Sequence, residues 1–192
     1  MADYTNISSV NYTDKDMQIL SQLAYVDFED EMIGLTFSDI LNNSKFYEEL
    51  YERFILNTTP PDPGSSAEAD YNWKLGVLEL LKNDEKYSNW KLVDVQDLND
   101  TQGMYAILVE TDEDSAIVAF RGSDSLSNDE YVLTDWIAAD GALILDGENT
   151  VQQDFATQYM ADYISQLGYD NLAMTGHSLG GNLAMHSKST AA

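Results

Sequence analysis

The sequence contains no cysteine and only two histidines, His177 and His186. The absence of cysteine excludes disulfides and thiol catalysis. Two histidines without any cysteine leave no spacing typical of a transition-metal site. We therefore predict a protein without a metal or another cofactor.

Basic residues are also scarce, because 9 Lys and Arg stand against 34 Asp and Glu, for a formal net charge of −25. Such a surface repels nucleic acid and anionic membranes. We interpret the charge as a source of solubility, as in a salty or acidic habitat. Calcium binding is the weaker alternative, since the acidic stretches Asp94–Asp100 and Asp112–Asp114 lack the glycine and the terminal glutamate of a Ca²⁺ loop.

Long apolar runs are absent, and none approaches the roughly 20 residues that span a bilayer. The N-terminus also lacks the basic and apolar segments of a signal peptide. We therefore predict a cytoplasmic protein without an integral membrane segment, with secretion after trimming as the alternative. The 192 residues predict one domain with a loose N-terminus over residues 1–12. All three prolines lie in Pro60–Ser66, which we interpret as a surface loop.

Hydrophobic periodicity changes from helical to strand-like along the chain. Thr13 and Asp16 resemble a capping box, and Ser38 is placed to cap a second helix. The expected helices span residues 13–28, 38–55, 67–83, 133–145 and 151–167, with Gly168 ending the last one. The expected strands span residues 90–95, 104–109, 116–120 and 172–175, with a hairpin turn at 110–114. This pattern predicts an α/β fold with a mostly parallel central sheet flanked by helices.

The most informative stretch is a G-x-S-x-G motif, Gly176-His177-Ser178-Leu179-Gly180, between the last expected strand and a helical pattern. Strand, sharp turn and helix form the context of a nucleophile elbow. The turn strains Ser178 and places its hydroxyl beside unpaired N–H groups at a helix N-terminus. Gly176 and Gly180 have no Cβ, so the strand and the helix are able to approach closely. The alternative is an ordinary glycine-rich turn.

A second informative stretch, Val118–Ser125, consists of a buried strand that ends in Arg121-Gly122-Ser123. An acyl-transfer site needs an oxyanion donor from such a strand-end loop, besides the N–H that follows the nucleophile. The simpler interpretation is a strand-end turn in which Arg121 pairs with a carboxylate.

Together these stretches resemble the class 3 lipases, the fungal-lipase-like branch of the α/β hydrolases. The matching features are Phe120-Arg121-Gly122-Ser123, Asp135-Trp136-Ile137-Ala138-Ala139-Asp140 and Thr175-Gly176-His177-Ser178-Leu179-Gly180-Gly181. The opening, Asp16 to Phe28, resembles a little-characterised bacterial group with the same core. The resemblance spans most of residues 14–187. It implies an α/β-hydrolase fold and a serine hydrolase that acts on carboxylic, lipid-like esters.

The resemblance also assigns roles by motif position. It implies that Ser178 is the nucleophile and that the N–H groups of Leu179 and Ser123 form the oxyanion hole, with the Ser123 hydroxyl assisting. Trp136 and Asp140 are then structural. The lid of the family corresponds to Leu126–Thr134, for which a plain surface loop is the alternative.

The acid–base half of a catalytic triad is not found in the sequence. The order in this fold is serine, then an acidic residue, then histidine, yet no acidic residue follows Ser178. We expect His177 to be a packed turn residue facing away from the serine hydroxyl. His186 lies eight positions further along a helix, roughly 12 Å away at about 1.5 Å per residue, beyond the reach of a general base.

We therefore expect the C-terminal strands of the fold, the triad acid and the base to be missing from this chain. An excised piece, a gene truncated at this point and a domain completed by another chain are three open explanations. Two functions remain open as well. The first is an esterase or lipase that is active only in a longer parent, although acyltransferase or peptidase chemistry could use the same elbow. The second is an inactive fragment that serves as an interaction or structural module.

Overall fold

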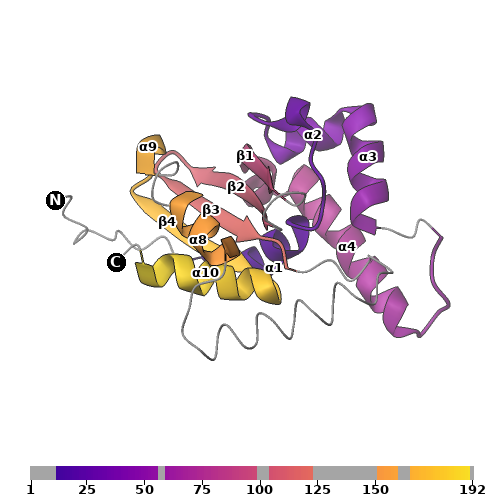
Figure 1. Ribbon diagram of the computed structural model, residues 1–192. Helices are drawn as coiled ribbons and strands as arrows, with labels where there is room; N and C mark the ends of the chain where they lie inside the picture. Colours follow the sequence, from indigo (N-terminus) through magenta and orange to yellow (C-terminus); the bar gives the residue numbers. More distant parts are fainter. Residues whose placement is uncertain (1–11, 56–58, 99–103, 123–150, 160–164, 191–192) are drawn as a thin grey trace.

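The computed structural model describes residues 12–55, 59–98, 104–122, 151–159 and 165–190. In this part of the chain a four-stranded sheet forms the centre, and helices cover both of its faces (Figure 1). The protein is therefore of mixed α/β class, as the sequence predicted. None of the helices in these ranges has the length and apolar character that crossing a membrane requires.

The sheet has the strand order β1-β2-β3-β4. β1 (Lys91–Leu98), β2 (Met104–Asp112) and β3 (Ser115–Phe120) form an antiparallel meander, whereas β4 (Asn171–Gly176) is parallel to β3. The predicted strand positions are confirmed to within a few residues, but the predicted mostly parallel sheet is wrong for these strands. The connections between β1, β2 and β3 are too short for the crossover that parallel neighbours need.

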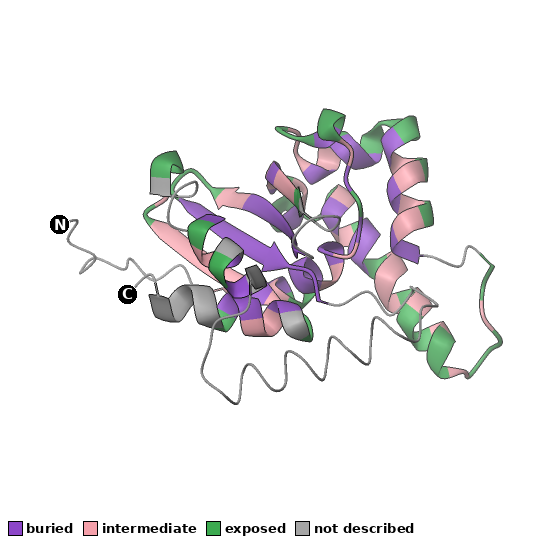
Figure 2. Cartoon of the chain, in the orientation of Figure 1, coloured by how far each residue is buried: buried purple, intermediate pink, exposed green. Residues whose placement is uncertain are grey.

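The two faces of the sheet carry separate cores. Figure 2 shows that the central strands between them are largely buried. Successive side chains of a strand point to opposite faces, so Ile107 and Leu108 of β2 enter different cores. One face, which we call the helical face, shares a continuous core with five helices, of which α1 contacts β3 and β4. These helices are α1 (Asp14–Leu23), α2 (Phe37–Asn42), α3 (Ser44–Ile55), α4 (Ser66–Asn83) and α5 (Glu85–Ser88). The other, which we call the elbow face, packs against α8 (Val151–Gln158) and α10 (Leu179–Thr190).

The first helices begin at capping boxes. The predicted box of α1 is confirmed, since the Thr13 side chain accepts from the Asp16 N–H and the Thr13 N–H donates to Asp16 Oδ2. The cap of α2 is Thr36 and not Ser38, because Thr36 has the acidic partner Asp39 three positions later. A short 3₁₀ helix, η1 (Asp30–Met32), precedes this cap.

Two helix boundaries correct the sequence prediction. The helix expected over 38–55 is two helices, because Asn43 is extended (φ −82°, ψ 119°) and its side-chain oxygen accepts from the N–H groups of Lys45 and Phe46. α1 ends at Leu23 rather than near Phe28. The segment after it leaves the helix because side chains at the strand ends bind its backbone, as described below.

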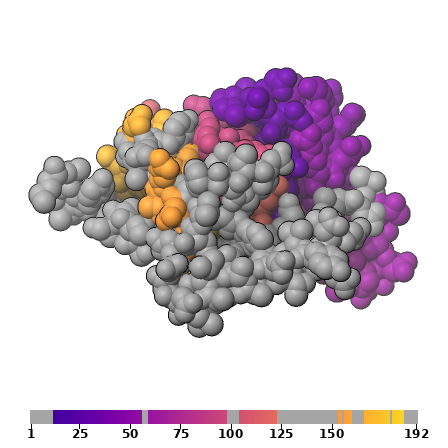
Figure 3. All heavy atoms as spheres, viewed as in Figure 1, coloured from indigo at the N-terminus to yellow at the C-terminus, as the bar shows by residue number. Residues whose placement is uncertain are grey.

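The remaining predicted elements divide between described and undescribed residues. α4 confirms the helix expected over 67–83, and Gly168 has the positive φ (77°) of a helix stop. The helix expected over 151–167 is described as α8 and α9 (Ser165–Leu167). The pattern at 133–145 and the lid at 126–134 lie outside the described residues. In Figure 3 the indigo and purple atoms of the N-terminal helices form one end of the visible face, apart from the orange and yellow C-terminal elements.

Candidate active site

The turn between β4 and α10 is the one for which the sequence predicts a nucleophile elbow. β4 ends at Gly176 and α10 begins at Leu179, so His177 and Ser178 alone make the turn. Ser178 has a φ of 57°, the one positive φ of a residue other than glycine in the described part of the chain. The left-handed region costs an L-residue roughly 1–2 kcal/mol, so the surrounding backbone must enforce it. The Ser178 side chain is exposed at the start of the helix.

Glycines let three backbone segments meet at this turn. A Cβ on Gly176 would lie 2.3 Å from the carbonyl carbon of Gly180, and a Cβ on Gly180 would lie 2.2 Å from the carbonyl oxygen of Phe120. Real Cβ atoms do not approach other heavy atoms this closely. The predicted close approach of strand and helix is confirmed, and the end of β3 joins the same contact.

The end of β3 lies directly beside the serine. Because β3 and β4 are parallel and pair Phe120 with Gly176, both strands end at the same edge of the sheet. A Cβ on Gly122 would lie 2.4 Å from the His177 carbonyl oxygen and 3.1 Å from the Ser178 Cβ. The backbone that leads into Ser123 therefore passes the Ser178 side chain.

The structure describes one of the two predicted oxyanion donors. Leu179 is the first residue of α10, where backbone N–H groups have no partner within the helix. Ser123 lies outside the described residues, as do Trp136 and Asp140. The position of the Ser123 N–H therefore stays a prediction, carried by the placement of its neighbour Gly122 beside Ser178.

Arg121 fixes the end of β3 to the segment that follows α1. Its side chain is buried (6 % exposed), and its Nε donates to the Ala24 carbonyl at 2.7 Å. Its Nη2 donates to Asp27 Oδ1 at 2.6 Å, and its guanidinium stacks on the Tyr105 ring at 3.8 Å from the ring centre. The simpler interpretation of Arg121, as the partner of a carboxylate, is confirmed.

Tyr105 of β2 binds the backbone of the same segment, residues 24–28. Its hydroxyl donates to the Val26 carbonyl at 2.9 Å and accepts from the Phe28 N–H at 3.2 Å. Burial raises the pKa of Tyr105 to about 12, so the hydroxyl stays protonated and keeps donating across the physiological pH range. Arg121 and Tyr105 together hold residues 24–28 against the strand ends.

The structure describes the side chain of His177 but not that of His186. His177 is exposed, and its Nδ1 lies 3.1 Å from the Tyr25 hydroxyl, with the rings edge to face at 5.9 Å. His186 belongs to α10, but its side chain lies outside the description, so its distance from Ser178 stays a prediction. Tyr25 was not predicted as a site residue, because no local pattern relates it to a residue 152 positions away.

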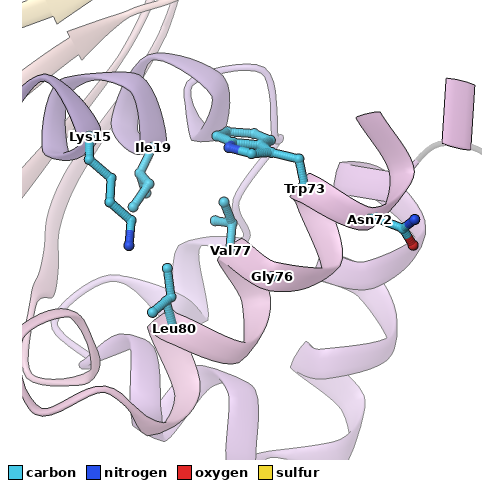
Figure 4. Close-up of a pocket in the computed structure, with 7 residues that line it drawn as sticks. All are labelled: Lys15, Ile19, Asn72, Trp73, Gly76, Val77 and Leu80. Atoms are coloured by element: carbon cyan, nitrogen blue, oxygen red, sulfur yellow. The ribbon is translucent and has the colours of Figure 1, made fainter. Parts of the chain in front are cut away.

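A hollow lies between α1 and α4, away from the turn at Ser178 (Figure 4). It has a volume of about 380 Å³, and its lining is mostly apolar with one amine and one amide. The lining residues are Lys15, Ile19, Asn72, Trp73, Gly76, Val77 and Leu80. No elbow residue lines it. Among the described residues, no group of three His, Asp or Glu side chains is placed to hold a metal ion.

Comparison with known protein families gives one match. The family model described as Mbeg1-like matches residues 82–192, from the end of α4 through the whole sheet to α10. The match covers more than half of the chain, which therefore belongs to the Mbeg1-like family. No curated protein and no solved structure matches the chain.

Proposed function

We propose that this member of the Mbeg1-like family is a serine hydrolase of the esterase or lipase type, with Ser178 as its nucleophile. One observation carries the proposal: an exposed serine with a φ of 57° between β4 and α10, beside the backbone of Gly122. The family match supports it by suggesting a relationship to lipase-like hydrolases. The fold we propose is that of the class 3 lipase-like α/β hydrolases, and the substrates are carboxylic, lipid-like esters.

In the proposed reaction, Ser178 Oγ attacks the ester carbonyl carbon. The carbonyl π electrons move to the oxygen, and the oxyanion is bound by the N–H groups of Leu179 and Ser123, assisted by the Ser123 hydroxyl. Collapse of the intermediate breaks the bond to the alcohol oxygen and leaves an acyl-serine, which water then hydrolyses. In the chain alone, solvent water takes the proton of the Ser178 hydroxyl during the attack. A proton is delivered to the departing alcohol as the bond to its oxygen breaks.

No triad acid or base is identified in this chain, so we expect the chain alone to react slowly. A serine hydroxyl without a base is a weak nucleophile at neutral pH. Removal of the triad from a serine protease leaves about 10³–10⁴-fold catalysis over water, from the oxyanion hole and binding. We expect at most this residual rate with short-chain esters, and activity on addition of a segment that supplies an acidic residue and a histidine.

Labelling with a fluorophosphonate, followed by peptide mapping, tests the proposal directly. Ser66 provides a matched control, because it is an exposed serine at the first position of α4 with an ordinary backbone conformation. We expect the label on the peptide that contains Ser178, its loss in Ser178→Ala and its retention in Ser66→Ala. Because the chain alone should react slowly, the labelling is repeated with an added segment that supplies an acidic residue and a histidine. Equal labelling of Ser66 and Ser178, or none at Ser178 in either case, would favour the inactive interaction module.

A further inference from the structure

The Tyr25 hydroxyl lies between the two strand ends that form the elbow site. It is 2.6 Å from the position that a Cβ on Gly122 would occupy, and the Ser178 Cβ is 3.1 Å from that same position. On its other side it meets His177 Nδ1 at 3.1 Å. The Tyr25 hydroxyl oxygen therefore packs against Gly122 and forms a hydrogen bond with His177, the residue before Ser178.

The placement of Tyr25 is enforced by its neighbours in the chain. Arg121 binds the carbonyl of Ala24, and Tyr105 binds the carbonyl of Val26 and the N–H of Phe28. Both side chains are buried, so these hydrogen bonds are sheltered from competition with water. The backbone on either side of Tyr25 is thus held to β2 and β3, which directs the tyrosine to the edge of the sheet.

We propose that Tyr25 is a positioning residue of the Ser178 site, an inference that rests on the proposed function. Its hydroxyl sets the separation between Gly122, at the end of β3, and the His177-Ser178 turn. In the proposed function, the carbonyl oxygen of a bound ester lies in that gap, next to the Leu179 N–H.

The chemistry explains why this separation matters. Oxyanion donors stabilise a transition state only when they are aimed at the developing charge before it appears. A displacement of about 1 Å in such a site costs on the order of 10²-fold in rate. Loss of the Tyr25 hydroxyl should therefore slow the chemical step more than it weakens binding of the substrate.

The experiment compares Tyr25→Phe with Tyr12→Phe. Tyr12 is a matched control at the other end of α1. Its hydroxyl forms a hydrogen bond with Thr111 Oγ1 at 2.7 Å, and Thr111 is not a residue of the elbow turn. The saturation kinetics of fluorophosphonate labelling give a maximal rate and a half-saturating concentration for each protein. We expect Tyr25→Phe to lower the maximal rate of Ser178 labelling about 10–100-fold, with little change in half-saturation. Both variants should have similar melting temperatures, and Tyr12→Phe should label like the wild type.

Nitrogen NMR of the imidazoles separates this proposal from the proposed function. The chain has only two histidines, so the His177 signals are assigned by comparison with a His186→Gln variant. Tyr25→Phe should shift the Nδ1 resonance of His177, whereas Tyr12→Phe should not. A wild-type labelling rate or an unmoved Nδ1 resonance in Tyr25→Phe overturns the positioning role. Absence of label on wild-type Ser178, also when a segment that supplies an acidic residue and a histidine is added, overturns the hydrolase itself. The NMR result then decides alone whether Tyr25 holds the His177-Ser178 turn in place.

Discussion

The two faces of the sheet are built from side chains of different size. The helical face buries the largest side chains of the described chain, among them Trp90, Tyr105 and Phe37. The elbow face also buries Phe120 and Tyr159, but four of the ten described residues of its core are alanines. These are Ala106 and Ala116 of the sheet and Ala156 and Ala184 of its helices. Bulky side chains bury more apolar area, whereas small ones let backbones approach. We infer that the helical face supplies most of the stability and that the elbow face supplies the geometry of Ser178.

The largest expected effect tests the stability half of this comparison. Ile107 and Leu108 are consecutive on β2, fully buried and directed to opposite faces. We expect Ile107→Ala to lower the free energy of unfolding by about 2–5 kcal/mol, because the dense helical core is unable to close the cavity. Leu108→Ala removes as many carbons but should cost less, since α10 is able to settle onto the sheet. Urea midpoints measure both, and a larger loss for Leu108→Ala would reverse the comparison.

The next effect concerns the ion pair that holds α1 in the helical face. Asp16 is fully buried and accepts two bonds from Lys86 Nζ at 2.7 and 2.8 Å. Burial alone would raise the pKa of Asp16, but the bonds from Lys86 and Thr13 outweigh it and leave the pKa below its usual 3.8. We expect Asp16→Asn to cost about 1.5–3 kcal/mol at neutral pH.

The pH dependence of this loss has a defined sign. Because folding lowers the pKa of Asp16, the carboxylate contributes its full stability above pH 3.8 and loses it as the pH falls through the folded value. The stability gap between wild type and Asp16→Asn should therefore narrow in acid. Urea titrations at pH 7 and near pH 3 measure the gap, and a constant gap would mean that the charge of Asp16 is not what α1 depends on.

The third prediction compares a glycine that packs against the end of β3, Gly180 of α10, with a glycine that has free space around it, Gly76 of α4. Gly180 of α10 has no room for a Cβ, whereas a Cβ on Gly76 of α4 would meet nothing within 4 Å. Gly180→Ala should destabilise by about 1–3 kcal/mol and abolish labelling of Ser178, because the end of β3 has to move. Gly76→Ala should stabilise by up to about 1 kcal/mol, since alanine is the better helix former. Equal effects of the two changes on the thermal midpoint would remove the argument for a backbone contact at the elbow.

The smallest effect has the opposite sign and tests the strain at the serine. Ser178→Gly should stabilise the protein by about 0.5–1 kcal/mol, because glycine adopts a φ of 57° without a steric penalty. Ser178→Ala keeps the Cβ and should gain nothing. Calorimetry measures the free energy of unfolding of both variants and of the wild type. A glycine variant no more stable than the alanine variant would show that the turn carries no strain.

The sequence predicted what depends on neighbours along the chain. Strands, capping boxes and the elbow turn are local patterns, and the structure confirms most of them within a few residues. The direction of the strands was missed because the hairpin connections, rather than the later crossover, decide most of the pairing. The break at Asn43 was missed because its extended backbone interrupts a periodicity that continues on both sides.

The site was predictable only in part for the same reason. Ser178 and its neighbouring glycines are recognisable from the spacing of the G-x-S-x-G motif, and the family match covers them. Tyr25 is brought to this turn by Arg121, which directly follows β3, and by Tyr105 of β2. Neither residue has a recognisable spacing to Tyr25. Ser123 and the predicted lid fall outside the described residues, so their roles rest on resemblance alone.

The pairing of β4 with β3 has a kinetic consequence. The hairpins of β1, β2 and β3 close over a few residues, but Ser115 and its partner Asn171 are 56 positions apart. Closing a longer loop costs more entropy, and nonlocal pairings slow folding. The turn at Ser178 thus belongs to the last part of the sheet to assemble. In refolding experiments, tryptophan fluorescence should recover before fluorophosphonate reactivity, which should mark the completed fold.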